Sequence, residues 1–184
     1  MMKKLIAIML MILTIGIMSA CGSSEQTDAE EQQETTTEES SEATAEATGD
    51  TMVIYFSVTG HTKTVAEMIT QITGADVYEI EAEEPYTDAD IDYSDDNSRA
   101  SIEQNDKSAR PAFAGDPPSL EGVKTLYLGY PIWFGQEPRI MDTFVEAVNF
   151  DGITVIPFCT SGSSGLGDSG KNLEQITGSG RWLA

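Results

Sequence analysis

Four hydroxyl-bearing residues and a glycine surround the end of the first apolar run, in the segment YFSVTGHT at 55–62. A helical pattern begins at Thr62, so the unpaired N–H groups and the positive dipole end of a helix would face this loop. Ser57, Thr59 and Thr62 add hydroxyl donors, and Gly60 permits close approach of the backbone. The segment therefore predicts an anion cradle suited to a phosphate, with an ordinary helix cap by Thr59 or Thr62 as the alternative.

Two adjacent aromatic residues follow a second strand-like run, in the segment YPIWFGQEP at 130–138. Trp133 and Phe134 stand directly before Gly135, so a planar ring ligand could stack on them with backbone amides close by. Aromatic residues more often belong to a core, and that role is the alternative for Trp133.

A third loop, at 159–170, is rich in glycine, serine and threonine. Such a stretch presents many backbone N–H and C=O groups with little obstruction from side chains, and could hydrogen-bond the edge of a heterocycle. A flexible linker is the alternative interpretation.

Apolar periodicity predicts the elements that would position these loops. Continuous apolar runs, typical of strands covered on both faces, occupy 52–58, 123–130 and 153–159. A fourth strand is predicted at 75–82, and helical spacing occurs from Thr62 to a stop at Gly74, after Pro138, and at 171–176. Strands that alternate with helices predict a three-layer, doubly wound parallel α/β sheet.

All three loops follow strand ends. In a doubly wound sheet, ligands bind outside the carboxyl ends of the strands, near the point where the strand order reverses. The loops at 57–62, 130–138 and 159–170 should therefore meet at one edge and share one ligand.

The stretch at 83–118 separates the second and third predicted strands and has few apolar anchors. A structureless loop of this length is uncommon and usually functional, so a short helix near 98–104 and a lid-like role are expected. A decorative insertion is the alternative. Tyr86, Arg99 and Arg110 are the candidates for contact with a substrate, against a role in stabilising the loop.

The first 20 residues are predicted to be a signal peptide. Lys3 and Lys4 precede an apolar stretch that ends at Met18, which is shorter than the roughly 20 residues that a membrane-spanning anchor, the alternative, requires. The sequence Met-Ser-Ala-Cys at 18–21 resembles the bacterial lipobox, with Met in place of the usual Leu. The resemblance implies cleavage before Cys21 and acylation of its thiol.

An acidic segment at 21–50 follows the signal peptide and contains no Lys, Arg or aromatic residue. It has too little apolar surface to offset the entropy of ordering, so it is predicted to be a disordered tether between a membrane and a domain at 51–184.

The chain has 31 acidic and 10 basic residues and a net charge of -21. Such a field repels a phosphate backbone, so nucleic acid is excluded as a partner. Complementary charge instead favours a partner with a basic face.

The three loops together resemble those of a flavodoxin, particularly the bacterial flavodoxin-like proteins that share PIW and PFCTSG, over about residues 52–182. The resemblance implies a flavodoxin fold, with strand order 2-1-3-4-5, that binds FMN without a covalent bond. The implied cofactor-binding residues are Ser57, Thr59, Gly60, His61 and Thr62 at the phosphate, Pro131, Ile132, Trp133, Phe134 and Gly135 along one side of the ring, and Thr160, Ser161, Gly162, Ser163 and Gly165 in the third loop.

The chain departs from that family pattern in two places. His61 stands where the family usually has Asn, and its imidazole either bonds the phosphate or faces solvent. After the fourth predicted strand the chain has no room for both a fifth strand and a last helix, so the fifth strand is expected to be missing and the protein to be C-terminally truncated.

The resulting hypothesis is an FMN electron carrier, lipid-anchored at the extracytoplasmic face of a bacterial membrane. No catalytic side chain and no metal are implied, since FMN itself carries the electrons to a partner protein or a small acceptor. One alternative is an FMN-dependent quinone or NAD(P)H oxidoreductase with the 83–118 segment as its lid. The other is a non-catalytic lipoprotein that binds a different ligand.

Overall fold

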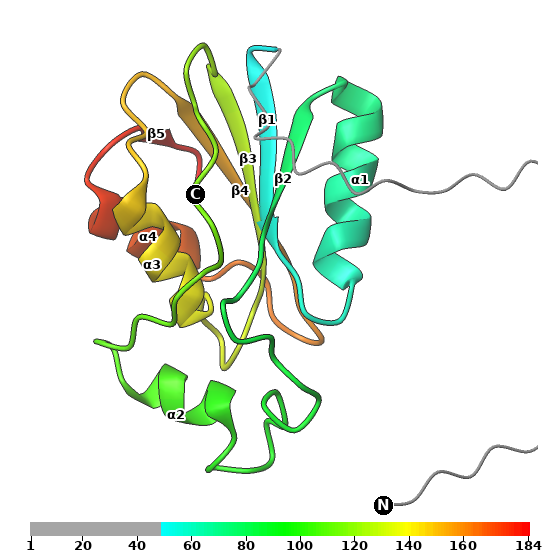
Figure 1. Cartoon of the computed structure of the whole chain (residues 1–184), viewed down its shortest axis with the longest axis vertical. Coiled ribbons are helices and arrows are strands. Elements are labelled where there is room, and N and C mark those ends of the chain that lie inside the picture. Colours follow the sequence, from blue (N-terminus) through cyan, green and yellow to red (C-terminus); the bar gives the residue numbers. More distant parts are fainter. Residues whose placement is uncertain (1–48) are drawn as a thin grey trace, which may run out of the picture. The chain divides into compact units, whose positions relative to one another are not determined.

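The computed structural model describes residues 49–184, which form one parallel five-stranded sheet with helices on both faces (Figure 1). The predictions for the signal peptide, for Cys21 and for nearly all of the tether lie outside the described residues. The strand order is β2-β1-β3-β4-β5, as predicted from the resemblance. The strands are β1 (Thr51–Phe56), β2 (Asp76–Ile80), β3 (Thr125–Pro131), β4 (Thr154–Thr160) and β5 (Arg181–Trp182).

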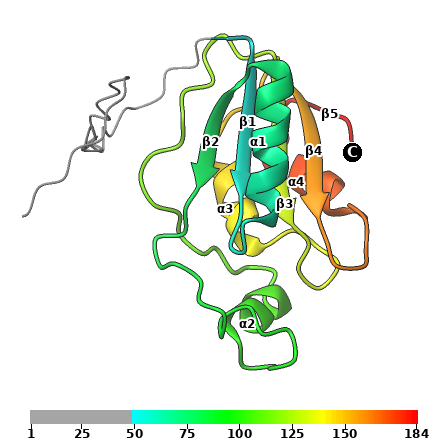
Figure 2. The ribbon, with the colours of Figure 1, turned by 90° about the vertical axis from the view of Figure 1, so that its right-hand side faces the viewer.

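Three helices pack on the sheet and a fourth lies beyond its edge. They are α1 (His61–Thr73), α2 (Arg99–Asn105), α3 (Arg139–Ala147) and α4 (Ser169–Thr177). Figure 1 shows α1 on one face of the sheet and α3 and α4 on the other. In Figure 2 the strand arrows point toward α2, so α2 stands beyond the carboxyl ends of the strands. Among residues 49–184, no helix is both long and apolar enough to cross a bilayer.

Strand β1 is buried on both faces, which explains its continuous apolar run. Met52, Ile54 and Phe56 belong to the larger core cluster, which includes residues of α3 and α4. Val53 and Tyr55 point the other way and pack with the α1 side. Each such side chain, when fully buried, stabilises the fold by about 1.5–3 kcal/mol, so β1 anchors both layers.

The ends of the predicted helices follow local chemistry. Gly74 ends α1 with φ +68°, and its N–H donates to the carbonyl of Thr70, as expected of a left-handed C-cap. Ser98 begins α2, where its hydroxyl accepts from the N–H of Ser101. The predicted short helix near 98–104 is therefore confirmed.

The expectation of a missing fifth strand is wrong. Residues of β5 pair in parallel with Thr154 and Val155, so β4 lies between two strands rather than at an edge. Trp182 is 8% exposed, its ring packs on Phe150 at 5.8 Å, and its Nε1 donates to the carbonyl of Ser179. A strand of two residues has no alternation for a sequence pattern to detect. The predicted truncation rested on that absence and stays a prediction.

The 83–118 segment is closed at its base. Ala82 and Phe113 form an antiparallel bridge, and the N–H of Glu83 donates to the carbonyl of Ala112 at 3.0 Å. The segment therefore leaves the sheet after β2, carries α2 and returns to the same place before β3.

Candidate functional site

The three predicted loops meet at the carboxyl edge of the sheet. The hydroxyls of Thr62 and Thr160 share a hydrogen bond of 2.8 Å, which joins the first loop to the third. The N–H of Ile132 donates to the carbonyl of Thr160 at 2.9 Å, which joins the second loop to the third. Thr160 thus connects all three, and the loops form one continuous surface.

A cavity of about 830 Å³ opens where these loops meet. Ligand pockets are commonly about 300–1,000 Å³, so its size suits a cofactor. No Lys or Arg is among the residues that line it. These residues are Thr59, His61, Thr64, Val65, Ile91, Tyr93, Pro131, Ile132, Cys159, Thr160, Ser161 and Gly162.

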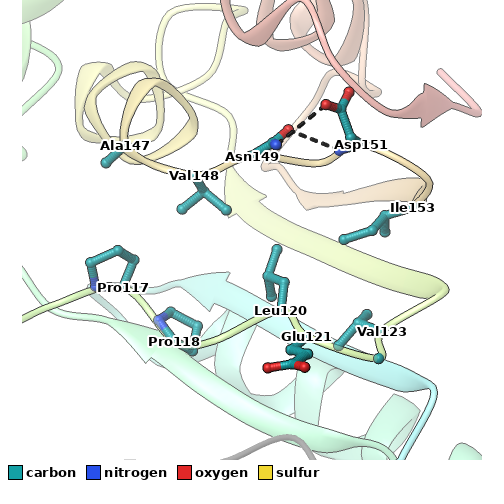
Figure 3. A pocket seen from close by; sticks show the side chains of 11 residues that line it. Pro117, Pro118, Leu120, Glu121, Val123, Ala147, Val148, Asn149, Asp151 and Ile153 are labelled. Atoms are coloured by element: carbon teal, nitrogen blue, oxygen red, sulfur yellow. Dashed lines mark hydrogen bonds between the residues drawn. The ribbon is translucent and has the colours of Figure 1, made fainter.

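A second cavity, of about 500 Å³, lies at the opposite end of the sheet (Figure 3). It is formed by the segment that enters β3 and the segment between α3 and β4, and none of the predicted site residues lines it. Two of its labelled polar residues, Asn149 and Asp151, hydrogen-bond to each other. The cavity at the carboxyl edge is therefore the better candidate for a phosphorylated ligand.

The start of α1 is left without a side-chain cap. Gly60 occupies the N-cap position with φ +83° and has no side chain that could accept from the first N–H groups of the helix. The alternative that Thr59 or Thr62 simply caps the helix is therefore wrong. The N–H groups of the first helical turn, which have no partner within a helix, remain to face an anion.

The side chains of the first loop are arranged around this helix start. Thr59 and His61 are exposed and line the cavity, whereas Ser57 is half-buried. Thr62 is 1% exposed and turns toward Thr160, so its hydroxyl lies inside the junction of the loops. His61 is the first residue of α1 and its exposed side chain lines the cavity, so its hydrogen bond to a phosphate stays a prediction.

The second loop is a tight turn that separates its two aromatic residues. Trp133 and Gln136 exchange both backbone hydrogen bonds, at 2.9 and 3.0 Å. Trp133 is 2% exposed and packs against Phe56 and Tyr86, so its side chain lies in the core beneath the turn. Phe134 is 48% exposed and is the aromatic side chain that this loop presents to solvent. A direct contact of Trp133 with a cofactor stays a prediction.

The third loop is held by local hydrogen bonds rather than acting as a loose linker. The hydroxyl of Ser161 accepts from the N–H groups of Ser163 and Ser164. Ser161 and Gly162 line the cavity, whereas Ser163 and Gly165 are exposed outside its lining. The loop therefore presents its first half to the site.

The candidate residues of the 83–118 segment serve its own structure. Tyr86 donates to Glu103 at 2.7 Å, and the Arg99 guanidinium lies 3.9 Å above the Tyr86 ring and also donates to Glu103. Burial raises the pKa of Tyr86. Arg110 pairs with Glu146 on α3 at 2.8 Å. Their stabilising role, the alternative stated from sequence, is the one that these contacts support.

Two other residues of this segment, Ile91 and Tyr93, line the cavity. The sequence does not single them out as site residues, because isolated apolar residues in an acidic loop have no periodicity that would give them a direction. The lining of the cavity thus includes the 83–118 segment as well as the three predicted loops.

A buried polar cluster lies beneath the second loop. Gln104 of α2 donates to the carbonyls of Glu137, at 2.8 Å, and Trp133, at 3.4 Å. Asn172 of α4 donates to the Glu137 carboxylate at 3.2 Å, and Arg139 lies between the Glu137 and Asp142 carboxylates. Burial raises the pKa of Glu137 and of Asp142. The cluster attaches α2 to the backbone of the second loop and α4 to the side chain of Glu137.

The remaining candidates for reactive groups near the cavity are a thiol and a metal site. Burial raises the pKa of the Cys159 thiol, which lines the cavity. Within residues 49–184, no three His, Cys, Asp or Glu side chains gather as a metal site would require.

The fold and site together define a flavodoxin-like α/β protein. Residues 50–184 match the flavodoxin family, which is most of the chain. The chain therefore belongs to the flavodoxin family.

Solved structures agree with this assignment. A Bacteroides uniformis protein described as a flavoprotein is 42% identical, with a TM-score of 0.70, over 73% of this chain and 86% of that one. A similar protein from Bacteroides eggerthii is 39% identical, with a TM-score of 0.69, over 72% and 84% of the two chains. A Lactobacillus acidophilus flavoprotein, solved in complex with FMN, shares the fold at 19% identity and a TM-score of 0.54, over 73% and 90%. Among curated proteins, no significant match is found.

Glu137→Gln should remove the electrostatic cost of a buried carboxylate, while its amide oxygen can still accept from Asn172. A carboxyl group whose pKa is raised in the folded state lowers stability as the pH rises above the usual glutamate range. The unfolding free energy of the variant minus that of the wild type should therefore increase from about pH 4 to about pH 7.5, measured by urea unfolding.

Glu146→Gln is the matched control on α3. Arg110 donates to the Glu146 carboxylate and holds its pKa below the usual value, so this group stabilises the fold at neutral pH and that contribution is lost as the pH falls. For Glu146→Gln, the unfolding free energy of the variant minus that of the wild type should become more negative as the pH rises. Slopes of the same sign in the two variants would contradict the assigned burial effect.

Proposed function

We propose that residues 50–184 bind FMN in the cavity at the carboxyl edge and transfer electrons, with Cys21 as a lipid anchor at the extracytoplasmic face of a bacterial membrane. The observation that carries the proposal is the uncapped start of α1, which opens into the cavity where all three loops meet. A helix start of this kind binds anions without needing a cation.

The residues present fit FMN, which has a phosphate at one end and an apolar ring at the other. Thr59, His61 and the first N–H groups of α1 would hold the phosphate. Pro131 and Ile132 would contact the ring, and the first half of the third loop would hydrogen-bond its edge. FMN supplies the redox chemistry when bound, so the protein's part is to bind it, orient it and limit the access of water.

The charge of the domain supports an electron-carrier role. Residues 51–184 contain 21 acidic and 8 basic residues, and the segment at 88–96 that carries Ile91 and Tyr93 has five aspartates and no Lys or Arg. Hydrogen bonds from Thr87 and Ser94 hold the pKa of Asp90 and of Asp92 below the usual value, so both stay ionised. Negative charge beside the ring disfavours the addition of an electron and attracts partners with basic faces.

Loss of the Thr59 and Thr62 hydroxyls should weaken FMN binding. In Thr59→Ala plus Thr62→Ala, the dissociation constant should rise by about 100-fold, because loss of the Thr59 hydrogen bond to a charged group costs about 1.5–3 kcal/mol and loss of the Thr62 hydroxyl breaks the bond to Thr160 that joins the first loop to the third. Titration with FMN, followed by quenching of flavin fluorescence, measures this. Thr73→Ala, at the far end of α1, is the control and should bind as the wild type does. Unchanged affinity in the double variant would refute the phosphate cradle. A wild-type protein that takes up no FMN would instead favour the alternative of a non-catalytic binding lipoprotein.

Electron transfer to a basic acceptor protein should depend strongly on salt. The reduced, FMN-loaded protein should react about 10-fold or more faster at low than at high ionic strength, because complementary charge speeds the encounter. Stopped-flow absorbance measures the rate, and a neutral quinone is the acceptor control that should show little salt dependence. A rate to the basic acceptor that does not depend on salt would contradict the carrier proposal, and rapid turnover of NADH or NADPH with the quinone would support the reductase alternative.

Cys21→Ser should release the protein from the membrane. The resemblance of residues 18–21 to a lipobox makes the Cys21 thiol the acylation site, and a lipid chain supplies most of the membrane affinity. After cell fractionation, the variant should be found in the soluble fraction and the wild type in the membrane fraction. Equal membrane retention of both would argue for an uncleaved membrane-spanning segment instead.

A further inference from the structure

A further cavity, of about 290 Å³, lies within the polar cluster beneath the second loop. It is bounded by the chain that follows α2, by the start of α3 and by α4, and it shares no lining residue with the cavity at the carboxyl edge. Its volume is at the lower end of the range of ligand pockets, so it suits a molecule much smaller than FMN. The charged residues of its lining are Lys107, Arg110, Glu137, Arg139 and Asp142.

Two of these lining residues are deeply buried and yet incompletely hydrogen-bonded. Arg139 is 4% exposed and Asp142 is 1% exposed. Among the described residues, Arg139 Nε and Asp142 Oδ1 have no hydrogen-bond partner, and neither has Oε1 of Gln104, whose carbonyl accepts from Arg139. Folded proteins pair nearly all of their buried polar atoms, so this cluster can accommodate a ligand that offers both a donor and an acceptor.

The charges of this cavity differ between its buried part and its exposed part. Glu137 and Asp142 are both buried, and the Arg139 guanidinium lies 3.8 and 3.2 Å from their carboxylates. Burial raises the pKa of both carboxyl groups, as expected where two carboxylates share one buried cation. Nearer to solvent, Arg110 is already paired with α3, whereas Lys107 is exposed and has no ion pair among the described residues. A positive group therefore suits the buried part, and a negative group suits the exposed part.

We propose that this cavity binds a small polar zwitterion of the α-amino acid class, with its ammonium group at Asp142 Oδ1 and its carboxylate between Arg139 Nε and Lys107. Such a molecule supplies the donor that Asp142 lacks and the acceptor that Arg139 lacks, and it adds no net charge to the cluster. Asn172 and Gln175 line the same cavity and favour a polar side chain on the ligand. The site is a binding function separate from that of FMN.

Titration calorimetry of the purified full chain with three matched compounds tests this arrangement of charges. L-Serine should bind. L-Glycerate has a hydroxyl in place of the ammonium group, and serinol has a hydroxymethyl group in place of the carboxylate. Each should bind about 10-fold or more weakly than L-serine, because each loses one charge-assisted hydrogen bond. Equal binding of all three compounds would overturn the inference of a zwitterion site.

Substitutions at the two ends of the cavity test the same contacts from the protein side. Asp142→Asn should raise the dissociation constant of L-serine by about 10-fold or more, and Lys107→Gln by about 5-fold. Lys171→Gln is the matched control, because Lys171 is an exposed lysine of α4 that does not line the cavity, and it should bind L-serine as the wild type does. Lys107 is exposed, so its replacement leaves the fold intact and keeps the test decisive even if Asp142→Asn fails to fold.

A wild-type chain that binds no L-serine at millimolar concentration would overturn the inference and leave the cavity to water. Equal weakening by Lys107→Gln and Lys171→Gln would overturn it too, since it would show only a dependence on net charge. A crystal structure of the complex should place the L-serine ammonium group within hydrogen-bond distance of Asp142 Oδ1, and water alone at that position would contradict the proposal.

Discussion

Parallel pairing of β1 with β3, and of β3 with β4, is the constraint on which the site depends. It places the carboxyl ends of all three strands at one edge, so that segments about 100 residues apart in sequence share a single hydrogen bond between Thr62 and Thr160. The pairing in turn depends on β1, whose side chains are buried alternately in the two layers. Any change that displaced β1 would separate the loops before it altered their chemistry.

The acidity of the domain imposes a second constraint. A dianionic phosphate must be held within a negative field, and no Lys or Arg lines the described cavity. Backbone N–H groups and hydroxyls can hold the phosphate in such a field, because their fixed dipoles attract an anion. They add no mobile cation that could pair with the surrounding carboxylates instead. Lys63 illustrates the point, since it stands in the first turn of α1 but pairs with Glu79 at 2.8 Å. A phosphate site that relied on Lys63 would compete with that carboxylate.

Much of the fold and the meeting of the three loops could be predicted from sequence, because both follow from apolar runs and from the turn signals between them. The strands at 52–58 and 153–159, the stop at Gly74 and the short helix near 98–104 are local properties of the chain. What could not be predicted depends on partners distant in sequence. A two-residue β5 exists because β4 offers it a free edge, and its sequence alone carries no pattern.

Dependence on distant partners also explains why the two aromatic residues of the second loop have different roles. Sequence places Trp133 and Phe134 side by side, but only the turn with positive φ sends one ring into the core and the other to the surface. Likewise, nothing in an acidic loop indicates that Tyr93 would reach the same place as Phe134. These features come from tertiary contacts that local propensity does not determine.

Phe134 has φ of +50°, which strains a bulky residue, and such strain persists only if the surrounding structure holds the turn at more than one point. Gln104 donates to the carbonyls on either side of the turn, and Tyr86 packs on the Trp133 ring beneath it. Both residues belong to the 83–118 segment, which also supplies Tyr93 to the Phe134 ring. This segment therefore fixes the conformation of the second loop as well as covering it. Because one element holds the strained turn and lines the cavity, movement of the segment would change the shape of the candidate flavin site and the strain in its loop together.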